Sequence, residues 1–206
     1  AIDPLVASGN LRTASRAGSL ANDAAKRLHD RQKRLAAIER ALEIAKEFNA
    51  PHDVIALTRM AAKAYVDTPT GKVSEADKER ALQAVDAGST WLDSFTEEID
   101  PQEMTFLRAG ITYIKGWVYM TSHDHYPAIP LLQEAFALQK EIKDAENYVF
   151  PLAALSQCYS ELGDTDALHN LLIEVKETIK TTSLHSGKLR TLAREIEKEL
   201  SGQDEA

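Results

Sequence analysis

The segment Ser122-His123-Asp124-His125-Tyr126 carries the densest set of side chains that could do chemistry. Imidazole and carboxylate groups are common metal ligands, so two histidines around an aspartate suggest a transition-metal site. Residues this close in sequence rarely face one ion unless a turn folds them, and no further His or Cys is predicted to lie nearby. The alternative interpretation is a polar turn in which the aspartate or a histidine caps the next helix. We favour the turn and expect no metal site and no cofactor.

The single cysteine, Cys158, limits the covalent chemistry of the chain. One thiol cannot form an intrachain disulfide, and it excludes thiolate zinc clusters and dithiol redox motifs. Cys158 directly precedes Tyr159 on a predicted helix, where a thiol is typically buried and structural. The sequence also lacks glycine-rich phosphate loops and the nucleophile elbow G-x-S-x-G. Because no coherent set of nucleophile, base and metal ligands appears, we expect no enzymatic activity.

The charge balance argues against a general nucleic-acid binder. The 206 residues contain 24 Lys and Arg against 32 Asp and Glu, a net charge of -8, whereas nucleic acid demands a basic footprint. Residues 1–34 are the exception, with seven Lys and Arg against three Asp. The basic run from Lys26 to Arg34 predicts either a docking helix for an acidic partner or a solvated face lying against the acidic remainder.

No apolar run approaches the roughly 18 residues that a bilayer crossing needs, so no membrane span is expected. The single cysteine favours a reducing compartment, and we expect a cytoplasmic protein. The first residue is Ala1, and a cleaved secretion signal stays open as the alternative.

Apolar residues recur at every third and fourth position from about residue 20 to about residue 200, which predicts an all-α fold. No segment alternates apolar and polar residues, so no β-sheet is expected. Most joints are short, and short joints force neighbouring helices to run antiparallel. We expect residues 1–20 to be irregular, 21–200 to form a single domain and 201–206 to be a flexible tail. The eight predicted helices span residues 20–48, 51–67, 74–96, 101–122, 127–142, 145–161, 165–181 and 186–200.

Several helix boundaries carry specific signals. Ser74 and Asp77 have the three-residue spacing of a capping box. Asp100 precedes a proline, whose missing N–H costs nothing in a first turn. For the same reason Pro127 and Pro130 are both expected in the first turn of their helix. Gly163 suits a left-handed helix end.

An internal repeat marks the middle of the chain. Three predicted helices carry a tyrosine that lies three positions after a pair of mostly small residues. The small residues would let two helices cross closely, and each tyrosine supplies packing area and a hydroxyl that can reach backbone. The motifs are Thr58-x2-Ala61-Ala62-x2-Tyr65, Phe106-x2-Ala109-Gly110-x2-Tyr113 and Leu152-x2-Leu155-Ser156-x2-Tyr159, and the helices that follow carry Ala81-x3-Val85-x2-Gly88, Ala128-x3-Leu132-x2-Ala135 and Leu168-x3-Leu172-x2-Val175.

These motifs resemble the tetratricopeptide repeat, whose pattern is W-x2-L-G-x2-Y followed by small and large apolar residues on a second helix. The resemblance covers about residues 50–180. Its tyrosines lie 48 and then 46 residues apart, against a usual spacing of about 34, so the repeats are elongated. The resemblance implies a right-handed superhelical stack of antiparallel helix hairpins. The helix 186–200, with its charged face, suits an exposed end that closes the stack.

The resemblance also implies a function, the binding of a protein or peptide in a concave groove lined by the first helix of each hairpin. The chain is then a non-catalytic scaffold or adaptor, whose cations suit a peptide with acids or a free carboxylate. The competing class is a sensor that holds a small ligand or peptide in an enclosed pocket of the superhelix. A homo-oligomer is compatible with either class. The implied groove residues are Arg59, Lys63, Ile111, Lys115, Tyr119, Phe150 and Gln157.

Overall fold

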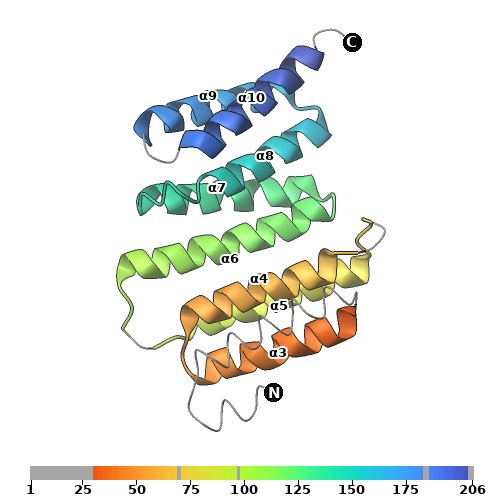
Figure 1. The fold of residues 1–206 in the computed structure, drawn as a ribbon, viewed down its shortest axis with the longest axis vertical. Coiled ribbons are helices and arrows are strands. Elements are labelled where there is room, and N and C mark those ends of the chain that lie inside the picture. The colour runs from red at the N-terminus through yellow and green to blue at the C-terminus, as the bar shows by residue number, and fades with distance from the viewer. Residues whose placement is uncertain (1–29, 69–70, 97, 183–185, 204–206) are drawn as a thin grey trace. The chain divides into compact units, whose positions relative to one another are not determined.

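The computed structural model describes residues 30–68, 71–96, 98–182 and 186–203. Within those ranges the fold is all-α, and none of the regular elements is a strand (Figure 1). This confirms the helical periodicity of the sequence. Residues 20–29 of the first predicted helix, the segment 1–20 and residues 204–206 lie outside the described ranges. The eight described helices are α3 (Arg31–Glu47), α4 (Pro51–Val66), α5 (Glu75–Asp93), α6 (Pro101–Thr121), α7 (His125–Glu141), α8 (Val149–Leu162), α9 (Thr165–Thr181) and α10 (Ser186–Gln203).

The boundaries that carried capping signals are confirmed. The Ser74 hydroxyl accepts a hydrogen bond from the Asp77 N–H at 3.1 Å. The Asp100 carboxylate accepts one from the Gln102 N–H at 2.8 Å. Gly163 follows α8 in the left-handed conformation, with a φ of 67°. Each side-chain cap satisfies an otherwise unpaired N–H and stabilises its helix by about 1 kcal/mol.

Two helix starts differ from the prediction. α7 begins at His125, earlier than expected, so Pro130 lies in the second turn of that helix and not in the first. A proline there leaves the helix one backbone hydrogen bond short. α8 begins at Val149, later than expected, because the preceding residues form a turn. Within that turn Asn147 donates its side-chain amide to the Asp144 carboxylate at 2.8 Å.

The chain divides into two compact units, with the boundary between Ile99 and Asp100. In the first unit α4 packs against both α3 and α5. Part of its core joins Ile38 of α3 to Ala61 and Ala64 of α4. The small side chains on α4 allow these helices to approach closely.

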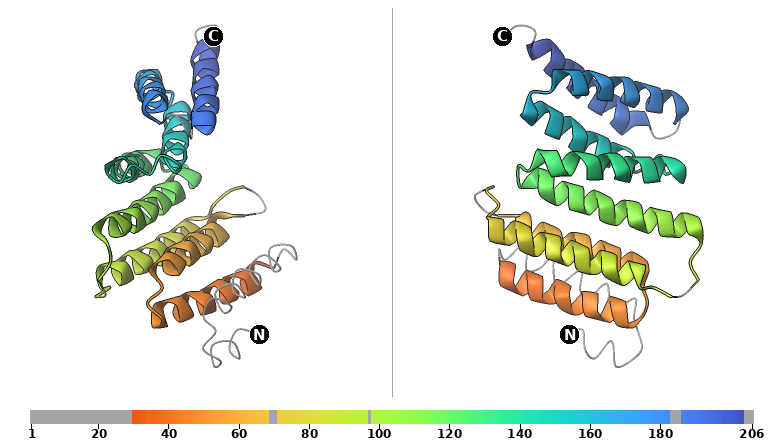
Figure 2. Two further views of the ribbon diagram at one scale, coloured as in Figure 1. Left: turned by 60° about the vertical axis from the view of Figure 1, so that its left-hand side comes forward. Right: turned by 180° about the vertical axis from the view of Figure 1, so that it is seen from behind.

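In the second unit each helix from α6 to α10 packs against the next, and consecutive helices run antiparallel (Figure 1). α8 also contacts α6 and α10, whereas α7 and α9 lie on the side of α8 away from α10 in the left view of Figure 2. Leu132, Leu152 and Leu168 are almost completely buried in the core between these helices. The predicted stack of antiparallel helices is thereby confirmed, and its right-handed twist stays a prediction.

The last helix, α10, packs on the second unit through one apolar face. Leu189 and Ile196 are buried, whereas Arg194 and Lys198 are exposed, as the charge pattern predicted. The helix continues to Gln203, so the first residues of the predicted tail are helical. Among the described helices, none combines the length and the apolar composition needed to cross a bilayer.

Candidate functional site

The predicted groove residues fall on both units. Two of them lie on α4 of the first unit, and the other five lie on α6 and α8 of the second. Ile111 is only 5% exposed, so its side chain belongs to the packing and not to an exposed lining. The exposed members are Arg59, Lys63, Phe150 and Gln157, and the half-buried members are Lys115 and Tyr119.

The three tyrosines that mark the repeat have different partners. The Tyr65 hydroxyl donates to the Glu39 carboxylate of α3 at 3.3 Å. The Tyr159 hydroxyl accepts a hydrogen bond from the Gln133 amide of α7 at 3.1 Å. Both hydroxyls therefore bond side chains of the preceding helix and not the backbone groups expected from the sequence. Tyr113 instead packs towards α8.

An exposed aromatic ring lies between α6 and α10. Phe150 of α8 is 43% exposed. The Tyr113 ring of α6 lies 6.2 Å from the Phe150 ring, centroid to centroid, at an interplanar angle of 52°. The Lys188 Nζ of α10 lies 5.6 Å from the same centroid, within the range of a cation–π interaction. Side chains of α6 and α10 therefore lie beside the exposed Phe150 ring of α8.

A second constellation forms where α6 turns into α7. The Asp124 N–H donates to the Tyr119 carbonyl and the His123 N–H to the Met120 carbonyl, each at 2.9 Å, which is the Schellman pattern. His123 takes the left-handed position of this motif, with a φ of 60°. Asp124 occupies the N-cap position of α7, but its side chain makes no capping hydrogen bond, and His125 begins the helix. The predicted polar turn is confirmed. This turn also folds the chain so that the two neighbouring histidines can face the same point.

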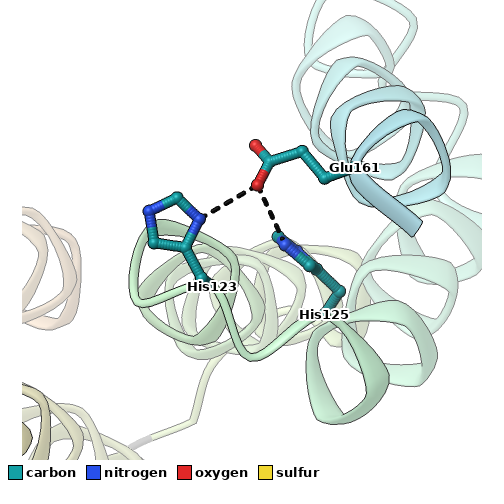
Figure 3. Close-up of side chains that lie close together, drawn as sticks. All are labelled: His123, His125 and Glu161. Carbon is teal, nitrogen blue, oxygen red and sulfur yellow. Dashed lines mark hydrogen bonds and ion pairs between the residues drawn. The ribbon is translucent and has the colours of Figure 1, made fainter. Parts of the chain in front are cut away.

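The two histidines meet a carboxylate from the last turn of α8 (Figure 3). The Glu161 Oε2 atom lies 3.0 Å from His123 Nδ1 and 3.0 Å from His125 Nε2. The three ligand atoms all lie within 4.8 Å of one another. Two imidazoles and one carboxylate are a donor set that binds zinc in proteins. The structure therefore adds a third donor to the pair of histidines that the sequence singled out.

No protein-family model and no curated protein matches this chain. The geometry and chemistry of the two constellations are therefore the observations that indicate a function.

Neighbouring side chains fix the histidine–glutamate cluster. Gln157 donates its side-chain amide to Glu161 Oε1 at 2.8 Å. This hydrogen bond, together with those from His123 and the nearby charge of His125, holds the pKa of Glu161 below its ordinary value, against the opposing effect of burial. The His125 side chain is 8% exposed, whereas that of His123 is 68% exposed. The cluster therefore has one buried side and one side open to water. Gln157, predicted to contact a partner, orients the carboxylate.

The sequence motifs did not single out Glu161, although the predicted helix order carried a usable signal. α6 and α8 are separated by one antiparallel helix, so they run in the same direction and end at the same end of the unit. The turn after α6 and the last turn of α8 are therefore neighbours. A polar residue just beyond Tyr159 was accordingly the place to seek a third donor.

Cys158 lies one turn before Glu161 on α8 and is fully buried, which confirms the predicted structural thiol. Burial, with a smaller effect of the Glu161 charge, raises the pKa of the Cys158 thiol to about 11. Because the thiolate is the reactive form, the folded protein should resist a disulfide-exchange reagent at neutral pH. In urea the same thiol should react fully, as measured by absorbance and intact mass. Equal labelling rates in the folded and unfolded protein would contradict this prediction.

Proposed function

We propose that the protein is a non-catalytic scaffold that binds a segment of another protein on the face that α6, α8 and α10 present around Phe150. The observation that supports this proposal is the exposed Phe150 ring between Tyr113 and Lys188. The proposal keeps the tetratricopeptide-like architecture that the motifs predict.

The energetic reason is the cost of leaving an aromatic ring in water. Covering apolar surface is favourable by about 25 cal/mol per Å², so a partner's apolar side chain placed on Phe150 would gain affinity. Aromatic side chains held in place by their neighbours are frequent centres of binding energy, because little conformational entropy is lost when the partner arrives. Tyr113 and Lys188 supply this support for Phe150.

The charge around the ring sets the chemistry of the partner. Lys188 on α10 is an exposed cation whose Nζ lies 5.6 Å from the centroid of the Phe150 ring. A segment that combines an apolar side chain with acidic residues or a free carboxylate is therefore expected to bind best. The chain as a whole has a net charge of -8, which would repel acidic segments elsewhere.

The test is a selection of peptides from a random display library, followed by fluorescence anisotropy with the recovered peptides. Phe150→Ala should weaken binding by about tenfold or more, because truncation of a central aromatic residue removes most of the contact energy. Ile173→Ala is the matched control, because Ile173 is an exposed apolar residue, 56% exposed, on α9. That variant should bind as the parent does. Lys188→Glu should weaken the acidic peptides selectively.

Peptides that bind Phe150→Ala as tightly as the parent, or that lose affinity only with Ile173→Ala, would contradict the proposed face.

A further inference from the structure

We propose that His123, His125 and Glu161 form a binding site for a divalent transition-metal ion of the zinc type. The site joins the turn between α6 and α7 to the last turn of α8 (Figure 3). It is separate from the face around Phe150 and does not rest on the scaffold proposal.

The spacing of the donor atoms fits a tetrahedral ion. Zinc bonds to nitrogen and oxygen of about 2.0–2.1 Å place neighbouring ligand atoms about 3.3 Å apart. The Glu161 Oε2 atom lies 3.0 Å from the nearer nitrogen of each histidine, close to this spacing, and all three donor atoms lie within 4.8 Å of one another. The two imidazole rings are almost perpendicular, at 87°, with centroids 6.0 Å apart. They therefore approach the shared point from different directions.

The donors are held in place before any ion arrives. His125 sits in the first turn of α7 with its side chain buried, and it presents Nε2, which lies 3.0 Å from Glu161 Oε2. Gln157 holds the second carboxylate oxygen of Glu161 at 2.8 Å. Such support from outside the ligand set orients the donors and raises the affinity of metal sites. His123 is fixed by the Schellman turn.

The donor types select the class of ion. Magnesium and calcium prefer sets made entirely of oxygen, whereas two imidazoles and a carboxylate suit zinc and its neighbours in the transition series. Three protein ligands leave a fourth position, which zinc fills with water or with a donor from another molecule. The exposed His123 side chain places this position at the surface. An ion bound there would clamp two hairpins together and stabilise the folded protein.

The experiment uses the full chain without a histidine tag. Calorimetric titration with Zn²⁺ should give one ion per chain, and the Tm should rise with zinc. Co²⁺ should give the intense visible absorption of a four-coordinate site. His123→Asn, which tolerates the left-handed backbone, and Glu161→Gln, which keeps the shape of the carboxylate, should each weaken zinc binding by at least about tenfold. Circular dichroism verifies that both variants are folded.

His169→Gln is the matched control, because His169 is an exposed histidine on α9 outside the cluster. It should bind zinc as the parent does, and millimolar Mg²⁺ should not displace the ion. The proposal is overturned if the parent binds no zinc, if Glu161→Gln and His123→Asn bind it as tightly as the parent, or if His169→Gln removes the binding. None of these outcomes bears on peptide binding at Phe150.

Discussion

Replacing Gly116 with valine is expected to lower the free energy of unfolding of the second unit by at least about 2 kcal/mol. A Cβ atom at Gly116 of α6 would lie 2.9 Å from Leu132 Cγ and 3.2 Å from Leu131 Cβ on α7. Leu132 is fully buried, so it has no free space to move into. Valine adds two methyl groups beyond Cβ, and its better helix propensity returns only a few tenths of a kcal/mol.

The two tryptophans allow each unit to be followed separately, because Trp91 belongs to the first unit and Trp117 to the second. In a Trp91→Phe background, urea unfolding read by Trp117 fluorescence reports on the second unit. Gly202→Val is the matched control, because a Cβ at that position of α10 meets nothing within 4 Å. It should change stability by no more than about 0.5 kcal/mol. A Gly116→Val variant as stable as its parent would contradict the close approach of α6 and α7.

Gly116 also marks where the sequence pattern stops being informative. The repeat motif drew attention to Gly110, which is half-buried in the structure. A close approach lies further along α6, at Gly116 against Leu132. Leu132 itself belonged to the predicted pattern of the second helix. A pattern names the residue types that pack, but in an elongated repeat it does not fix where two helices cross, because that depends on their relative tilt.

Local chemistry explains why the helices were largely predictable and the cluster was not. The cap at Ser74 and the left-handed end at Gly163 depend on residues within one turn, so the sequence displays them directly. α7 begins earlier than predicted because the Schellman turn after α6 uses few residues. The proline at Pro130 gave no indication of how short that turn is. Glu161 lies next to His123 because α6, α7 and α8 pack one after another. This contact can be predicted from the sequence only if the stacking of the helices is assumed first.

The basic run near the start of the chain had two interpretations, a docking helix or a face lying against the acidic remainder. Arg31 and Arg34 pair with acidic residues, as the second interpretation expected, but Arg34 is not solvated. Arg34 is buried, with 7% of its surface exposed, and pairs with Asp67 at 3.2 Å. Arg31 turns towards both α4 and α5. Lys26 and the residue after it lie outside the described ranges.

Arg31→Ala is expected to lower the free energy of unfolding of the first unit by about 2 kcal/mol. The Arg31 guanidinium donates to the carbonyls of Ala64 at 3.1 Å and Tyr65 at 2.6 Å, at the end of α4. It also donates to the Asp77 carboxylate in the first turn of α5 at 2.7 Å. One side chain therefore ties the ends of three helices and satisfies carbonyls that have no partner within α4.

The effect of Arg31→Ala should depend on pH in a defined direction. The hydrogen bond from Arg31 is the largest cause that holds the pKa of Asp77 below its ordinary value of 3.8, with burial opposing it and Ser74 adding to it. A carboxylate with a lowered pKa in the folded state stabilises the fold above the unfolded value, and this contribution is lost as the pH falls through the folded value. The difference in stability between parent and variant should therefore be full at about pH 7 and should shrink below about pH 3.8. It should not vanish, because the bonds to the two carbonyls do not titrate.

The measurement is urea unfolding at several pH values, read by Trp91 fluorescence in a Trp117→Phe background. Arg40→Ala is the matched control, because Arg40 lies on the same helix and pairs with Glu43 on its exposed face at 3.0 Å. A surface pair of this kind contributes at most about 0.5 kcal/mol, since water screens both charges and the side chains lose entropy. If Arg40→Ala destabilises the first unit as much as Arg31→Ala, the loss comes from removing any arginine of α3. If instead the Arg31→Ala difference is the same at every pH, the carboxylate of Asp77 contributes nothing to the junction of the three helices.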